Sequence, residues 1–187
     1  MIRDLVQAVV CSSSILMLAC NSNVSVDTSE IDSLTTVEQQ ANFLIELARL
    51  DQKVRLEEDS VLDAFGPESR EYEAAWRNIS DTDRANNRKI EYYLQKHGYP
   101  SVRQHGVQAC DAPFLIAHHS SDYDQKVRLY PFLHSAWKSG DLPGGQFTFF
   151  LNRMYRERFG RSIEWSRPFF EQEEIDTLIY ELDLGER

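Results

Sequence analysis

From Thr36 onward the apolar residues of this chain recur at helical spacing, and this pattern limits the possible fold more than any other feature. Each helical residue advances about 100° around the axis, so residues three, four and seven apart share one face. Alternation of apolar and polar residues, which is typical of a half-buried strand, never continues for more than a few residues. Glycine (8) and proline (6) are too scarce for an all-β sandwich with many tight turns. We therefore expect a mostly α-helical chain with a single multi-helix domain.

Cap and turn residues indicate where the helices end. Thr36 is a candidate N-cap, and glycines 98, 140 and 160 stand where helix C-caps are expected. Ser80 and Asp83 have the spacing of a capping box, which predicts that one helix ends before Ser80 and another begins there. We expect Trp76 to face inward and Pro131 to kink its helix or to begin the second half. The expected helices cover about 37–62, 69–78, 80–98, 109–119, 122–139, 147–158 and 171–184.

The N-terminal residues have the layout of a secretory signal peptide. Residues 5–19 are mostly apolar, Arg3 precedes them, and a polar stretch follows Cys20. The run is shorter than the roughly 20 apolar residues of a membrane span. Because Cys20 comes directly after the expected cleavage point, the segment is similar to the lipobox of bacterial lipoproteins. A plain secretory signal and an uncleaved anchor are the alternatives.

This similarity implies a domain organisation and a location. Residues 1–19 would be a signal peptide, 20–35 a lipidated cysteine with a polar tether, and 36–187 one helical domain. Cys20 would carry fatty acids such as palmitate, which anchor the protein to a membrane of the bacterial cell envelope. The residue after the cysteine, Asn21, favours the periplasmic face of the outer membrane or the cell surface.

Charge and cysteine content exclude several classes of function. The chain carries 20 Lys+Arg and 30 Asp+Glu, a net charge of −10, which opposes electrostatically driven binding to nucleic acid. It has no glycine-rich phosphate loop, no His-Glu-x-x-His and no cysteine pair, so we expect neither a cofactor nor a metal site. After loss of Cys11 and lipidation of Cys20, Cys110 has no disulfide partner and is expected to be a small buried hydrophobe.

Polar residues interrupt the apolar faces of two expected helices. The stripe formed by Leu44 and Ala48 continues into Asp51 and Arg55, with Gln52 at its edge. In the third expected helix, Asp83, Asn86 and His97 lie on the same face as the apolar residues at 90, 93 and 94. Because a buried charge is costly unless it is paired, these groups are expected to meet each other or a ligand. A simple i, i+4 ion pair and helix caps are the alternatives.

A third polar cluster follows the apolar run that ends near residue 119. Adjacent histidines point to different faces, so we expect His119 to face inward and His118 to face solvent or cap the helix. The spacing of His119 and Asp122 would let the carboxylate orient the imidazole, as in a general base and its partner. These patterns predict that Asp51, Arg55, Asp83, Asn86 and His119 converge in one polar pocket, with Arg55 paired to Asp51 or Asp83.

Short motifs spread over residues 45–162 resemble a bacterial family known only as domain of unknown function 6624. The matching motifs, in chain order, are Asp51-Gln52-x-x-Arg55, Asp83-x-x-Asn86, Gly98-Tyr99-Pro100, His119 with Gln125, Tyr130-Pro131-Phe132-Leu133, Asn152-Arg153 and Phe159-Gly160. The resemblance implies no reaction, but it adds Gln52, Gln125 and Arg153 to the candidate pocket. The family differs from this chain at His118 (Gln), Tyr99 (Trp), Asn152 (Asp), and near Glu157 and Ser162 (Gln).

Two functions from different classes agree with these patterns. In the first, an envelope lipoprotein domain binds a small polar ligand or a protein partner through the pocket. In the second, the protein is a hydrolase or transferase in which His119 acts as acid or base. Asp51 or Asp83 would then orient the histidine, and Arg55 or Arg153 would hold an anionic group. The two differ in one requirement: an enzyme needs His119 within hydrogen-bond reach of a carboxylate in an open cleft.

Overall fold

A computed structural model describes residues 27–163 and 171–185, which form eight α-helices and contain no β-strand. The expected mostly α-helical fold is therefore confirmed. The expected signal peptide, Cys20 and the first part of the tether lie outside the described residues. Among the described helices, none is long and apolar enough to cross a membrane.

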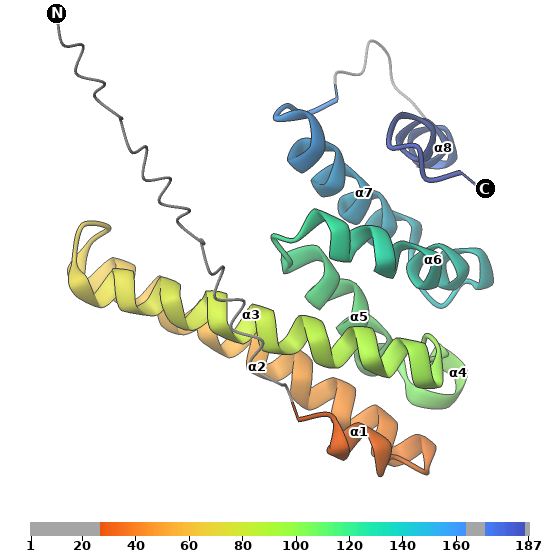
Figure 1. Cartoon of the computed structure of the whole chain (residues 1–187), viewed down its shortest axis with the longest axis horizontal. Helices are drawn as coiled ribbons and strands as arrows, with labels where there is room; N and C mark the ends of the chain where they lie inside the picture. The colour runs from red at the N-terminus through yellow and green to blue at the C-terminus, as the bar shows by residue number, and fades with distance from the viewer. Residues whose placement is uncertain (1–26, 164–170, 186–187) are drawn as a thin grey trace, which may run out of the picture.

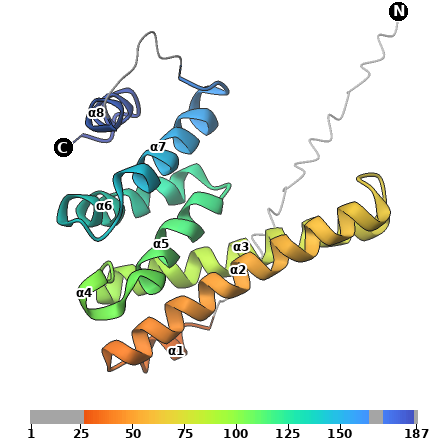
Figure 2. The same cartoon turned by 180° about the vertical axis from the view of Figure 1, so that it is seen from behind.

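A long helical hairpin forms one layer of the molecule. Helix α2 (Val37–Phe65) begins at Thr36, whose side chain accepts from the Gln39 amide while the Gln39 side chain accepts from the Thr36 amide. Helix α3 (Arg70–His97) returns antiparallel to it and ends at Gly98, as expected. The closed end of the hairpin, around residues 62–75, projects beyond the other helices in both views (Figures 1 and 2).

The expected break between residues 78 and 80 is absent, because α3 is one continuous helix. The Ser80 hydroxyl donates to the Trp76 carbonyl one turn earlier, 3.0 Å away, so it supports the helix instead of capping a new one. The expected inward position of Trp76 is also wrong. Its side chain is 49% exposed, since among the described helices this part of α3 packs against α2 alone.

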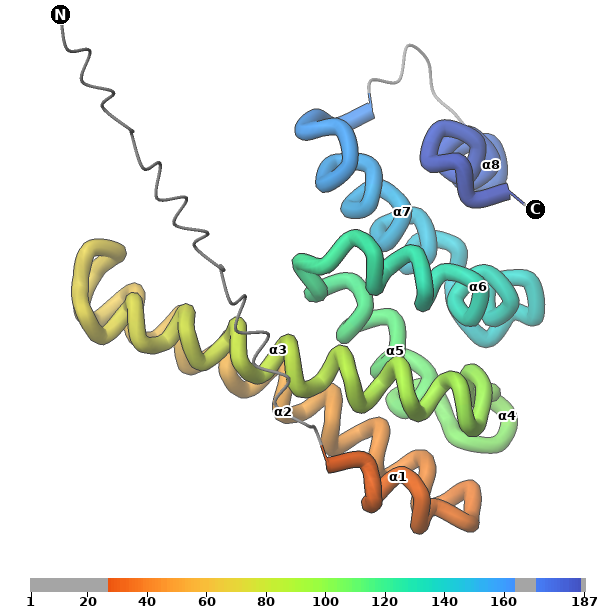
Figure 3. Tube along the Cα trace, in the orientation of Figure 1, coloured from red at the N-terminus to blue at the C-terminus, as the bar shows by residue number. Residues whose placement is uncertain are grey.

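The remaining helices form a second group beside the hairpin (Figure 3). Helices α4 (Val102–His105) and α5 (Val107–His119) pack on α2, and α5 also contacts α3. Helix α6 (Tyr123–Ser139) begins at the Asp122 N-cap and continues through Pro131, and Gly140 ends it in the left-handed conformation. Helix α7 (Gly144–Phe159) packs on α5, α6 and α8 (Glu171–Glu181). The bounds of α5, α6, α7 and α8 agree with the expected ranges to within about three residues, whereas α4 was not expected.

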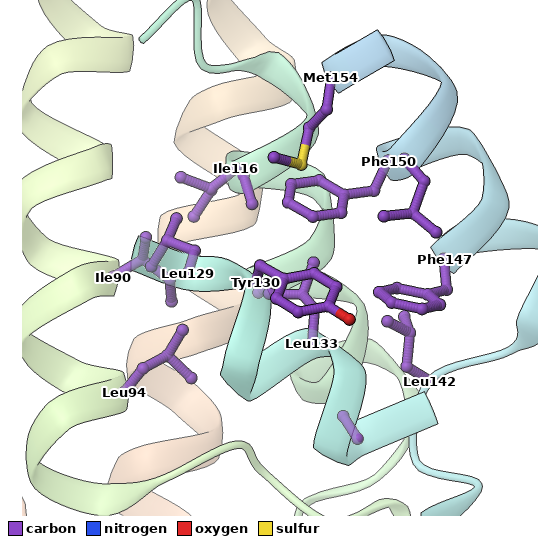
Figure 4. Packing of buried hydrophobic residues seen from close by; sticks show 14 of the residues in the cluster. Ile90, Leu94, Ile116, Leu129, Tyr130, Leu133, Leu142, Phe147, Phe150 and Met154 are labelled. Carbon is purple, nitrogen blue, oxygen red and sulfur yellow. The ribbon is translucent and has the colours of Figure 1, made fainter. Parts of the chain in front are cut away.

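One hydrophobic core joins the two groups (Figure 4). Ile90 of α3 lies beside Leu129 of α6 in Figure 4, and Leu94 and Leu133 belong to the same cluster; all four are fully buried. On the far side of α6, the fully buried Phe147 lies 6.1 Å from Tyr130 and 5.2 Å from Trp137 by ring centroids. The packing fixes the hairpin relative to α5 and α6, and this arrangement positions the candidate site.

Part of the expected tether belongs to the domain. Helix α1 (Ser29–Asp32) places Ile31 fully in the core, and the Asp32 carboxylate accepts from Tyr92 (2.7 Å) and Lys96 (2.5 Å) of α3. The expectation that the domain begins at residue 36 is therefore wrong, because residues 29–32 pack on it. A single isoleucine in a polar stretch has no periodicity that could have shown its burial.

Cys110 has the structural role expected of it. It is 2% exposed, and its Sγ lies 3.2 Å from the Pro100 carbonyl. Burial raises the pKa of this thiol to about 11, so it stays protonated and unreactive at neutral pH.

Candidate active site

A polar cleft of about 1060 Å³ opens where the projecting hairpin meets the turn between α5 and α6. The α2–α3 hairpin forms one wall, and residues 119–122 with the start of α6 form the other. Charged side chains of both signs line this cleft. They are Arg55, Glu58, Asp59, Asp83, Arg84, Arg88, Glu91, Asp122, Arg128 and Arg153.

Four of the five residues expected to converge form one hydrogen-bonded network at this cleft. Arg55 donates through Nη2 to Asp83 (2.7 Å) and to Asp51 (3.3 Å), and its Nε lies 3.0 Å from His119 Nδ1. The same Nδ1 lies 2.8 Å from Asp51 Oδ2. Arg55 is thus paired with both candidate partners, where the sequence pattern left the choice open.

The network is largely shielded from water. Asp51 is 1% exposed, whereas the side chains of Arg55 and His119 are about a fifth exposed on the cleft side. Burial raises the pKa of Asp83, and the neighbouring Arg55 guanidinium opposes this shift. One arginine therefore pairs with two carboxylates in a partly desolvated place, and removing this shared cation is costly.

Asn86, the fifth expected member, does not join the network. It is 4% exposed, it does not line the cleft, and its Nδ2 has no hydrogen-bond partner among the described residues. The adjacent Asn87 lines the cleft instead. His97, on the same expected face, lies near Gln40 and the Ile31 carbonyl, away from the cleft.

The expected pairing of His119 with Asp122 is also wrong. The Asp122 carboxylate accepts from the Gln125 amide at 3.1 Å and so caps α6. Asp51, distant in sequence, takes the place beside the imidazole. Helical spacing could not show this contact, because it depends on how α2 packs against α5.

The residues implied by the family resemblance surround the network. Gln52 donates to Asp51 Oδ2 at 2.9 Å from the outer face of α2. Gln125 is buried and accepts from the Ser120 hydroxyl, while Arg153 lines the cleft and contacts Glu157 at 3.2 Å. Asn152, where the family has aspartate, instead donates to Glu174 of α8 at 2.8 Å.

Sequence patterns missed a buried ion pair beside the cleft. Lys126 is fully buried, and its Nζ lies 2.7 Å from Glu157, which also accepts from Arg153. Burial lowers the pKa of Lys126 to about 8, although Glu157 opposes this shift. Lys126 stands three residues before Leu129 and seven before Leu133, so it shares the apolar face of α6. This helical spacing could have predicted that Lys126 is buried.

The expectation that His118 faces solvent or caps its helix is wrong. Its ring packs on Phe114, and its Nδ1 is enclosed without a hydrogen-bond partner among the described residues. Burial, followed by the nearby cation Arg153, lowers the pKa of His118 to about 4. The folded protein therefore holds this ring neutral.

A pH-dependent stability follows from the half-buried neutral ring. The native state binds no proton at His118 until about pH 4, whereas an unfolded histidine binds one below about 6.5. Stability should therefore fall as the pH drops from 6.5 towards 4, by about 1 kcal/mol at pH 5 after allowance for solvent screening. Urea unfolding at pH 7 and pH 5 measures the loss, with His118→Gln as the non-titrating control. Equal losses in both proteins would contradict this assignment.

Among the described residues, no group of three His, Cys, Asp or Glu side chains is arranged to hold a metal ion. At the cleft, the place between Asp51, Asp83 and His119 is taken by the Arg55 guanidinium.

Comparison of this chain with protein-family models, curated proteins and solved structures found no match in any of the three. The resemblance to family 6624 therefore remains a prediction based on the motifs of the sequence.

Proposed function

We propose that the cleft binds a small polar ligand and that His119 acts there as an acid–base group for hydrolysis or group transfer. The observation that carries this proposal is the 2.8 Å contact between Nδ1 of His119, which lines the open cleft, and the carboxylate of Asp51, which is buried behind it. A buried carboxylate that holds one ring nitrogen fixes the tautomer and leaves the other nitrogen for chemistry.

The proposal includes an assignment of the His119 tautomer. The Arg55 Nε contact at 3.0 Å requires a lone pair on Nδ1, whereas the Asp51 contact requires a proton there. We assign the proton to Nδ1. Asp51 is 1% exposed, so its carboxylate must accept hydrogen bonds from neighbouring side chains instead of from water. Arg55 retains its bonds to both carboxylates in this tautomer. Nε2 is then free to accept a proton from a ligand or from water.

Activated water, or a hydroxyl of the ligand itself, fits this site better than Ser120 as the nucleophile. Ser120 follows His119 directly, but it is fully buried and its hydroxyl donates to Gln125 at 3.0 Å. A nucleophilic serine must instead donate to the base. The expected reaction class is therefore general-base hydrolysis or transfer without a covalent intermediate on Ser120.

Ligand binding without turnover is the second candidate. It is favoured by the contacts within the network, in which Arg55 already contacts Asp51, Asp83 and His119. The guanidinium would then serve the fold, and the remaining lining groups would bind the ligand.

Replacing His119 with glutamine separates the two candidates. Glutamine can still donate to Asp51 but cannot exchange a proton, so His119→Gln should change the melting temperature little and reduce turnover by about 10²-fold or more. Wild-type protein and the variant are incubated with an extract of small polar metabolites, and mass spectrometry follows consumption. Compounds consumed by the wild type alone support catalysis. Compounds retained but unaltered support binding, and equal consumption by both proteins would refute a catalytic role for His119.

We also propose that the protein is lipid-anchored in the bacterial envelope through Cys20, on the basis of the lipobox-like sequence. The wild type should then partition into the detergent phase and incorporate labelled fatty acid, and Cys20→Ser should move it to the soluble fraction. Cys110→Ser serves as the matched control, since Cys110 is buried in the domain. Unchanged partitioning of Cys20→Ser would end the lipoprotein assignment.

A further inference from the structure

One buried carboxylate in the cleft has no partner among the described residues. Glu58 of α2 lines the cleft and is 9% exposed, yet no described residue forms a hydrogen bond or ion pair with it. Its oxygens are not among the fully enclosed polar atoms, so the buried stem carries a carboxylate that still reaches the solvent of the cleft. A carboxylate in such a place has an unmet need for a cation or a donor.

The cations of the cleft do not meet this need. Arg55 is held by Asp51 and Asp83, Arg128 by Glu91 at 2.7 Å, and Arg153 by Glu157. Arg84 lies 3.6 Å from Asp81, and Arg88 is not free either. A ligand anion would have to compete with these existing pairs. Among the described residues, the unpaired charge of the cleft is therefore negative and lies at Glu58 and Asp59, of which only Glu58 is buried.

An exposed aromatic ring stands on the same part of the hairpin. The Arg55–Asp83 contact sets the antiparallel register of α2 and α3. Glu58 is three residues from Arg55, and Trp76 is seven residues from Asp83, both towards the closed end of the hairpin. At 1.5 Å per residue these offsets are about 5 Å and about 10 Å. Trp76 lines the cleft and is 49% exposed.

We propose, on the basis of the function proposed above, that the ligand carries an organic ammonium group that binds at the outer end of the cleft between Glu58 and Trp76. A carboxylate supplies the ion pair, and an indole face attracts a cation through its quadrupole. With the same rise of 1.5 Å per residue, the ammonium would lie about 5–10 Å along the hairpin from the His119 network. The substrate class is therefore an amine-bearing polar molecule whose reacting group lies that far from its nitrogen.

Titration with 1,5-diaminopentane tests this site, with 1,5-pentanediol as the uncharged probe of matched length. We expect the amine to bind saturably in 0.15 M salt by calorimetry and to shift the Trp76 indole NMR signal, which Trp76→Phe identifies. The diol should do neither. Glu58→Gln should weaken binding about tenfold or more, the loss expected for a desolvated charge partner. Trp76→Leu should weaken it about threefold.

The neighbouring Glu57 supplies the matched control. Its side chain is 53% exposed, it pairs with Lys53 and it does not line this cleft. Glu57→Gln removes the same charge and should leave binding unchanged. No saturable binding, equal binding of the diol, or equal weakening by Glu57→Gln and Glu58→Gln would overturn the proposal.

The test is independent of His119 chemistry. His119→Gln should bind 1,5-diaminopentane like the wild type, because the imidazole is not part of this subsite. Loss of turnover in His119→Gln without amine binding to the wild type would refute the ammonium subsite alone. Amine binding with full turnover in His119→Gln would refute the catalytic proposal alone.

Discussion

Arg55→Ala is expected to lower the free energy of unfolding by about 3–5 kcal/mol, because it leaves two partly buried carboxylates without their shared cation. Asp51, at 1% exposure, would keep only Gln52 and His119 as donors. Urea unfolding followed by circular dichroism at pH 7 measures the change, provided the transition is two-state.

Arg49→Ala is the matched control for this experiment. Arg49 lies on the same helix and contacts Glu46 at 2.8 Å, but both side chains are more than half exposed. Its removal should cost less than about 0.5 kcal/mol, as for other exposed helix pairs. A similar small loss for Arg55→Ala would mean that the network does not carry the stability that its burial implies.

Phe147→Ala should have an effect of similar size, about 3–5 kcal/mol, through a cavity and not through charge. The ring is fully buried, and it stacks with Tyr130, Trp137 and Phe150 where α6 meets α7. The same unfolding experiment measures this loss.

Phe149→Ala tests whether burial causes the loss. Phe149 belongs to the same helix but is 67% exposed, so its removal should change stability by less than about 0.5 kcal/mol. Equal losses at 147 and 149 would contradict the packing of α7 on α6.

Local sequence signals predicted most helix ends because caps act within a few residues. Thr36, Gly98, Gly140 and Gly160 stand at the expected positions. The false break before Ser80 came from the same kind of signal. A serine followed three residues later by an acidic residue also occurs inside helices. Its hydroxyl can then donate to the carbonyl four residues earlier in the chain, as Ser80 does.

The candidate site was predictable where it depended on one helix face and unpredictable where it depended on packing between helices. Burial of Asp51 followed from the apolar stripe of α2. The contact of Asp51 with His119 joins residues 68 positions apart, and no pattern within one helix contains it. Glu58 and Lys126 were missed because such side chains are normally exposed.

The protonation of the His119 ring is the most direct test of the proposed chemistry. Nitrogen-15 NMR of the imidazole, assigned by comparison with His119→Gln, distinguishes a protonated from an unprotonated ring nitrogen. We expect the neutral ring to carry its proton on Nδ1, next to Asp51, and to leave Nε2 unprotonated. A proton on Nε2, with Nδ1 accepting from Arg55, would contradict the proposed role of His119 as a base presented to the cleft.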